Sequence, residues 1–283
     1  VGGVGPIEAF EGGEGFDLIV LATKADDAIA VAPRLAAMLR DGGTLLPIQN
    51  GGVPQLLAER LGACVLGGLS NLGATMVEPG VYEQRNAGHL LVGELGGDRP
   101  EGPDAASERA ERVRAWLGRG VEVRTTANMR GAVWSKLLLN CSVTTIGAIA
   151  GRTMREYLGL PGGREAFDRA YAEALGVALA SGARPERMLV EPEPPRDPEG
   201  YGAWLEGVLA AYGDLKPSML QDFERGRRTE IDYINGYVAD LGRRLGVPTP
   251  VNAAIVEAVR AITRGEARPD PRVLRVVAGE AAG

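Results

Sequence analysis

The chain has 283 residues, 45% of them hydrophobic, and a net charge of −6. This length and composition allow two domains of ordinary size, while the acidic balance without a basic cluster argues against nucleic acid as a partner. No apolar run is expected to span a membrane and no signal peptide opens the chain, so we expect a cytoplasmic protein. Its two cysteines lie far apart and there is a single histidine, which predicts neither a disulfide framework nor a metal site.

The first half alternates apolar runs with helical patterns. Such alternation predicts βαβ units and a mainly parallel sheet, an α/β fold. The expected elements are a strand at 16–24, a helix at 26–39 stopped by Asp41, Gly42 and Gly43, a strand at 44–48, a helix at 53–61 and a strand at 64–69.

A different pattern follows between residues 73 and 93, where short β runs flank turns and predict an appended hairpin or meander. An amphipathic helix at 105–117 and a strand at 121–124 close this half near Thr126. We therefore expect an α/β domain over residues 1–126.

Helical periodicity dominates residues 127–283, which predicts an all-α domain. Between its helices, residues 184–200 are rich in proline and predict a loop. Helices are expected at 129–150, 163–181, 201–212, 228–245 and 251–264.

The stretch 129–150 is apolar on almost every side, which is typical of a buried helix. Lys136, Asn140 and Thr144 recur at every fourth position and therefore share one face of it. A buried ammonium must be paired or shift its pKa, and such a group is a candidate general acid. The alternative is a lysine that extends from the helix to solvent.

Two polar residues follow expected parallel strands. Lys24 ends the first strand, and Asn50 lies in a Gln-Asn-Gly-Gly turn after the second. Ligands bind outside the carboxyl ends of such strands, so both are candidate ligand contacts. The alternatives are a solvated strand end for Lys24 and an ordinary turn for Asn50.

Glu230 stands one residue from the apolar stripe of the expected helix 228–245, which Thr229 would cap. One interpretation is an acidic first turn favoured by the helix dipole. The other is a carboxylate that faces Lys136 and orients it or the ligand.

Three blocks of the sequence resemble the ketopantoate reductase (2-dehydropantoate 2-reductase) family. They are Asp17–Lys24 together with Gln49–Gly51, Trp134–Cys141, and Ser218–Gly236 (SMLQDFERGRRTEIDYING). The resemblance implies an incomplete Rossmann-type dinucleotide-binding domain over residues 1–126 that binds NADPH. It also implies a helical C-terminal domain of the 6-phosphogluconate dehydrogenase type over residues 127–283, which binds substrate and dimerises. The implied reaction is the reduction of ketopantoate to pantoate in pantothenate and coenzyme A synthesis.

The resemblance also implies roles for individual residues. Lys136 matches the family's general acid, and Glu230 matches an acid that contacts the cofactor and holds the closed site. The cofactor-binding set is Lys24, Asn50, Ala74 and Glu230. The substrate-binding set is Asn50, Lys136, Asn140, Thr144 and Ser218.

The chain departs from the family in three ways that matter, one of which is that Leu215 and Met154 stand where further Asn contacts are expected. It has no GxGxxG turn after a strand, so the resemblance implies that on the order of 50–70 residues of the family's first unit are absent. Thr144 stands where the family has a second substrate-binding Asn. We therefore keep three alternatives: a ketopantoate reductase, a reductase of a related 2-oxo acid, and a non-catalytic homologue whose helical domain dimerises.

Overall fold

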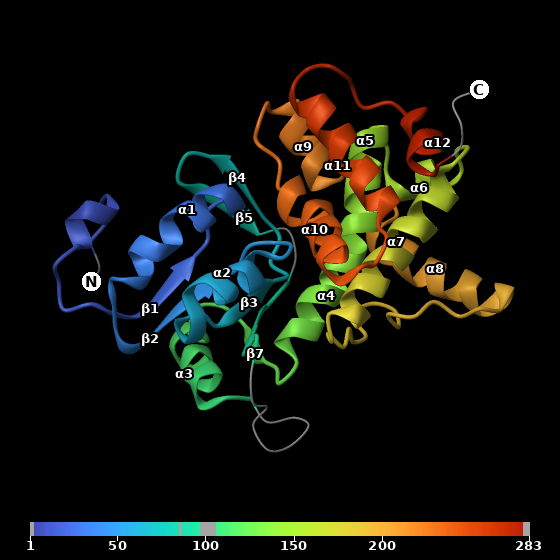
Figure 1. Ribbon diagram of the computed structural model, residues 1–283. Coiled ribbons are helices and arrows are strands. Elements are labelled where there is room, and N and C mark those ends of the chain that lie inside the picture. The colour runs from blue at the N-terminus through green and yellow to red at the C-terminus, as the bar shows by residue number, and fades with distance from the viewer. Residues whose placement is uncertain (1–2, 85–86, 97–105, 280–283) are drawn as a thin grey trace. The chain divides into compact units, whose positions relative to one another are not determined.

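The computed structural model describes residues 3–84, 87–96 and 106–279. The chain forms two compact units, Val1–Arg130 and Gly131–Gly283. The first is an α/β unit and the second consists of helices, so the expected fold class is confirmed (Figure 1). The division falls within helix α4 (Met129–Leu139), a few residues after the boundary expected at Thr126.

The first unit begins with a βαβ arrangement. Strands β1 (Phe16–Leu21) and β2 (Leu39–Pro47) pair in parallel, and α1 (Ala25–Ala36) connects them. The Asp-Gly-Gly sequence that was expected to stop the helix lies inside β2 instead. There Gly42 adopts a φ of +74°, and a Cβ on Gly43 would come within 2.7 Å of the Phe16 carbonyl oxygen. These glycines therefore accommodate the register shift between the two strands.

Helix α2 (Val53–Leu61) has the expected bounds, and a short 3-10 turn, η2 (Gly62–Cys64), follows it. The third strand is thus shorter than expected. The rest of the unit comprises β3 (Gly67–Ser70), β4 (Ala74–Glu78), β5 (Val81–Gln84), β6 (Leu90–Gly93), α3 (Glu108–Leu117) and β7 (Val123–Thr125). Ala105, the expected start of α3, is outside the described residues.

The sheet topology combines both kinds of pairing. Strands β4 and β5 form the expected hairpin, β6 pairs with β3 antiparallel and with β7 parallel, and one parallel bridge joins Leu45 of β2 to Val65. Side chains from β2, β6 and α3 pack into one core, where Leu46, Val92 and Val113 are fully buried. This core fixes the ends of β1 and β2, where the ligand residues were expected.

The second unit is built around α4 and its continuation. A π-helical segment η3 (Asn140–Thr144) and α5 (Thr145–Ala150) extend α4 into one rod. Around it lie α6 (Met154–Leu158), α7 (Gly163–Ala180), α8 (Pro198–Tyr212), α9 (Ser218–Glu224), η4 (Ile231–Tyr233), α10 (Asn235–Leu245), α11 (Pro250–Thr263) and α12 (Val273–Val277). The sequence did not predict the short helices α6, α9 and α12.

One stretch could cross a membrane by length and composition alone, which was not expected. Met129–Ala150 is long and apolar enough by length and composition, but 89% of its most apolar window is buried inside the protein. Trp134, Leu138 and Ile146 of this rod are all 0% exposed. Burial among the other helices identifies it as a core helix.

The expected helix 228–245 is broken in the structure. Glu230 precedes the 3-10 turn η4, and α10 begins only after Ile234, whose ψ of −98° is not helical. Thr229 therefore caps no helix. Ile231, Ile234 and Val238 are nevertheless buried, so the apolar stripe predicted the packing correctly although the backbone is not a single helix.

Candidate functional site

Lys136, Asn140 and Thr144 lie on the central rod of the helical unit. Lys136 belongs to α4, and the other two residues are the first and last of the π-helical segment η3. Asn140 is 8% exposed, whereas Lys136 and Thr144 are partly buried. The polar stripe inferred from the spacing is thus set in an otherwise buried helix.

Side-chain hydroxyls explain why the rod widens at η3. Ser142 donates to the Leu138 carbonyl oxygen at 2.8 Å, Thr144 to that of Asn140 at 2.9 Å, and Thr145 to that of Cys141 at 2.7 Å. Each hydroxyl competes for a carbonyl one turn back, which loosens the regular ladder. A π turn is wider than an α turn, so residues four apart drift less around the axis. Such segments are frequent at functional sites.

Lys136 has the perturbed ionisation expected of a buried amine. Burial lowers its pKa from 10.5 to about 8, although the negative charge of Glu230 opposes this change. At neutral pH the amine is therefore still mostly protonated, yet it releases its proton more readily than an exposed lysine. Lys136 and Glu230 of the helical unit thus interact electrostatically. This agrees with the interpretation of Glu230 as a carboxylate that faces Lys136.

The break before α10 determines where Glu230 lies. Glu230 is the residue before the 3-10 turn η4 and is partly buried. At the other end of this turn, Asn235 is fully buried and donates to the Cys141 carbonyl oxygen at 3.1 Å. The segment that carries Glu230 is thereby tied to the rod that carries Lys136.

The other expected substrate contacts differ in their surroundings. The Thr144 hydroxyl donates its proton to the Asn140 carbonyl oxygen, so toward a ligand it is left as an acceptor. Ser218 is exposed and begins α9, after Pro217. Thr144 therefore cannot replace the donating amide of an asparagine in this arrangement.

Lys24, Asn50 and Ala74 lie in the α/β unit. Lys24 is the exposed residue before α1, Asn50 is partly buried in the turn after β2, and Ala74 begins β4. Gly51, with a φ of +74°, gives the turn after Asn50 a conformation that favours glycine. The ends of the two parallel strands thus carry the polar residues that the sequence predicted there.

Gln49 joins the ends of two strands, although the sequence predicted only that it belongs to a turn. Its Nε2 donates to the Leu21 carbonyl oxygen at 2.8 Å and to that of Thr23 at 3.0 Å, which ties the ends of β1 and β2 together. Its position in a Gln-Asn-Gly turn after a buried strand was the signal that could have identified it.

A nicotinamide cofactor fits this edge of the sheet. The Gln49 Oε1 is buried and has no hydrogen-bond partner among the described residues, and the same holds for both polar atoms of Gln55 in the first turn of α2. Buried polar atoms without partners are costly, and the hydroxyl and amide groups of a dinucleotide are of the kind that satisfy them. Parallel strand ends followed by a helix are also the usual place for such a ligand.

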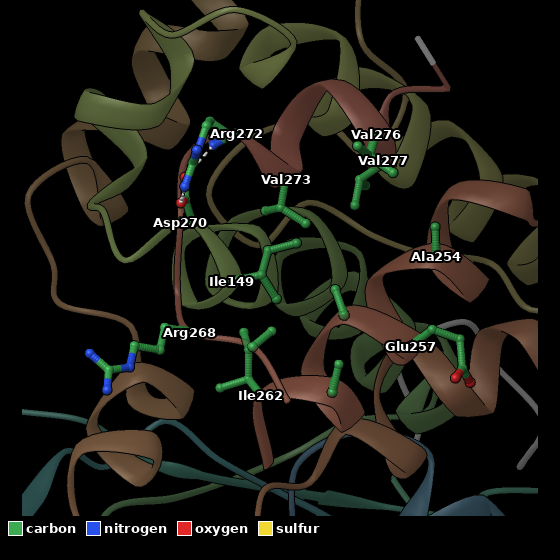
Figure 2. Close-up of a pocket in the computed structure, with 13 residues that line it drawn as sticks. Ile149, Ala254, Glu257, Ile262, Arg268, Asp270, Arg272, Val273, Val276 and Val277 are labelled. Atoms are coloured by element: carbon green, nitrogen blue, oxygen red, sulfur yellow. Dashed lines mark hydrogen bonds and ion pairs between the residues drawn. The ribbon is translucent and has the colours of Figure 1, made fainter. Parts of the chain in front are cut away.

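A different cavity lies in the helical unit, with a volume of about 630 Å³ (Figure 2). Ile149, Ile262 and Val273 contribute to its mainly apolar lining, and the Asp270–Arg272 ion pair stands at its rim. None of the predicted site residues lines it. Within the described residues, no group of three or more histidine, cysteine or acidic side chains is placed to hold a metal ion.

Comparisons with known proteins define the class to which this fold belongs. The chain is a two-domain oxidoreductase with a Rossmann-like N-terminal unit and a helical C-terminal unit. Two family profiles match it: "Ketopantoate reductase PanE/ApbA" over residues 5–97 and "Ketopantoate reductase PanE/ApbA C terminal" over residues 128–263. The protein belongs to the ketopantoate reductase family.

Individual relatives agree with this assignment. The chain is 31% identical to the 2-dehydropantoate 2-reductase of Pyrococcus horikoshii, over 87% of the chain and 75% of the relative. It is 30% identical to that of Halobacterium salinarum, over 88% and 76%. A PanE/ApbA family ketopantoate reductase from Ralstonia eutropha JMP134 has a similar structure, with a TM-score of 0.72, 25% identity, and coverage of 91% of this chain and 78% of that one. The family supports a nicotinamide cofactor and a small 2-oxo acid substrate.

Proposed function

We propose that the protein reduces 2-dehydropantoate (ketopantoate) to pantoate with NADPH, the reaction named for its relatives in Pyrococcus and Halobacterium. The observation that carries this proposal is Lys136, a partly buried amine whose pKa is lowered to about 8 beside Glu230. Residues 1–126 are proposed to bind the dinucleotide, and residues 127–283 to bind the substrate.

Lys136 is the proposed general acid. As the substrate carbonyl is reduced, its carbon gains a hydride and its oxygen develops negative charge. The Lys136 ammonium stabilises this charge and then donates a proton to the oxygen, which completes the alcohol. The neutral amine regains its proton from water. A bound nicotinamide supplies the hydride.

Other residues are proposed to hold the reactants. Asn140, one turn after Lys136 on the rod, would donate its amide to the substrate, and Ser218 its hydroxyl. Lys24, Asn50 and Ala74 would line the cofactor's nicotinamide end. Glu230 would keep Lys136 protonated, because its negative charge raises the pKa of that amine.

Lys136→Met is the direct test. A general acid typically contributes a factor of about 10²–10⁴, so we expect turnover with NADPH and ketopantoate to fall by at least about a hundredfold. Lys216→Met is the matched control, because Lys216 forms an exposed ion pair with Glu224 at 2.6 Å. Wild-type turnover in Lys136→Met would refute the proposal.

A related 2-oxo acid is the second candidate substrate, and the Thr144 hydroxyl favours it. That hydroxyl donates to the Asn140 carbonyl oxygen, so it does not supply the donor that an asparagine would offer to ketopantoate. Measuring kcat/KM for a panel of 2-oxo acids with different side chains distinguishes ketopantoate from the related acids. The highest kcat/KM for ketopantoate would remove the second candidate.

The proposed location is the cytoplasm and the proposed oligomer is a homodimer. Cys64 and Cys141 are both free thiols, which suits a reducing cytoplasm. The helical unit is the proposed dimerisation unit, and sedimentation of the purified protein tests this, because a monomer at micromolar concentration would contradict it.

A further inference from the structure

A buried asparagine connects the two acid-base residues of the proposed site. Asn235 is 0% exposed, and its Nδ2 donates to the Cys141 carbonyl oxygen at 3.1 Å and to Asn252 Oδ1 at 2.9 Å. Cys141 lies in η3, on the rod that carries Lys136. Asn235 begins α10, directly after the turn that follows Glu230.

The orientation of this amide is determined by its neighbours. Asn252, also 0% exposed, donates its Nδ2 to the Ala170 carbonyl oxygen at 3.1 Å and to Glu173 at 2.9 Å. Its Oδ1 must therefore point toward Asn235, which in turn must present its NH₂ group. Carboxylate oxygens of Glu173 also accept from the backbone N–H groups of Val251 and Asn252, each at 2.9 Å, and so hold the first turn of α11.

A second contact joins the same two elements. The rings of Trp134 on the rod and Tyr237 on α10 lie 5.8 Å apart between centroids. Packing at Tyr237 and hydrogen bonding at Asn235 thus fix α10 against the rod at neighbouring positions. The ring contact tolerates a broader range of geometries than the hydrogen bond, so we expect the hydrogen bond to constrain the register of the segment before α10 more tightly.

We propose that Asn235 is a positioning residue, which holds the Glu230 segment in register with the rod that carries Lys136. This role rests on the proposed reductase function. Asn235 itself does not touch the substrate. It acts through the Cys141 carbonyl group, to which it supplies a bond from another element, whereas Thr145 supplies one from within the same rod.

Loss of this bond has a distinct consequence for catalysis. Without it the Glu230 carboxylate is no longer held near the Lys136 amine. The Glu230 charge, which raises the pKa of Lys136, would then act from farther away, and the pKa of Lys136 would fall. Since a general acid works only while protonated, the fall in activity with rising pH would begin at a lower pH.

The test compares Asn235→Leu with Thr145→Val. Asn235→Leu keeps the number and branching of the side-chain heavy atoms but removes both donated hydrogen bonds. A displacement of about 1 Å in a catalytic group can cost a hundredfold. We expect kcat to fall by at least about tenfold, KM to change much less, and the alkaline midpoint of the kcat profile to move down by about half a pH unit or more. Thr145→Val removes a hydroxyl bonded to the same carbonyl oxygen from within the rod, so we expect it to change kcat and the midpoint much less than Asn235→Leu does.

Asn235→Ser covers the case in which the leucine variant does not fold. Its shorter hydroxyl can make one of the two bonds, so an intermediate kcat and a smaller shift of the midpoint are expected. A wild-type kcat and midpoint in the folded variant would overturn the positioning role. If Lys136→Met has lost turnover in the same assay, that result leaves the reductase function intact, whereas full turnover in Lys136→Met would refute the function itself.

Discussion

The two units differ in how far their own hydrogen bonds and charges already satisfy the candidate site residues. In the helical unit, Lys136 and Glu230 lie on elements connected by a buried polar network, and the pKa of the lysine is already shifted. In the α/β unit, Asn50 lies in a turn, and the acceptor atom of the neighbouring Gln49 has no partner among the residues that the structure describes.

This difference separates two tasks. A proton donor needs a fixed environment before the substrate arrives, because its ionisation depends on burial and on neighbouring charge. A ligand-binding edge needs polar atoms that the ligand itself satisfies. Substitutions in the helical unit should thus change the chemistry, and those at the strand ends should change binding.

The largest expected effect concerns stability. The pKa of Lys136 is about 8 in the folded protein and 10.5 in the unfolded chain, so the folded state disfavours the charged amine. Lys136→Met should therefore raise the free energy of unfolding at pH 7, by up to about 3 kcal/mol.

The advantage of Lys136→Met should shrink as the pH rises. Between pH 8 and 10.5 the folded protein has released the Lys136 proton and the unfolded chain has not, so wild-type stability increases relative to the variant. Denaturant titrations of both proteins at pH 7 and pH 10 measure this difference. A difference that stays constant with pH would show that burial does not perturb Lys136.

Glu230→Gln should have the next largest effect. It removes the charge that raises the pKa of Lys136, so kcat should fall about tenfold at pH 8 and the alkaline midpoint should move to lower pH. Glu224→Gln is the matched control, since Glu224 pairs with Lys216 on the surface. If the alkaline midpoint of Glu230→Gln stayed at its wild-type value, Glu230 would not be the residue that raises the pKa of Lys136.

Asn50→Ala should have the smallest effect, and it should change cofactor binding instead of the chemical step. We expect the KM for NADPH to rise severalfold through the loss of hydrogen bonds, while the pH midpoint stays at its wild-type value. Steady-state kinetics at several pH values provide the measurement. A displaced midpoint would mean that Asn50 acts on the proton donor, and the contrast between the two units would not hold.

Much of the fold was predictable because periodicity reports burial directly. The helix 129–150 and the helix α2 were expected at their observed bounds, and the hairpin of β4 and β5 followed from its turn. The Asp-Gly-Gly sequence was misassigned because a glycine pair can either stop a helix or occupy a bulge in a strand. Only the pairing of β1 with β2 decides between these two outcomes.

Less of the candidate site was predictable. The spacing of Lys136 and Asn140 placed both on one helix face, but no local pattern signalled the π-helical segment or the break before α10. The π-helical segment coincides with the hydroxyl bonds of Ser142, Thr144 and Thr145. The break coincides with Asn235, which bonds to a carbonyl group far away in the sequence. The same long-range contact explains why Glu230 precedes a 3-10 turn instead of lying in the first turn of a helix.

The most direct measurement is the pKa of the Lys136 amine. The protein has only three lysines, Lys24, Lys136 and Lys216, so NMR of the protein labelled at lysine ¹³Cε should give three resonances, and Lys136→Arg identifies the relevant one. We predict that Lys136 titrates at about pH 8. Titration at its ordinary value of 10.5 would contradict its assignment as a buried acid tuned for proton donation.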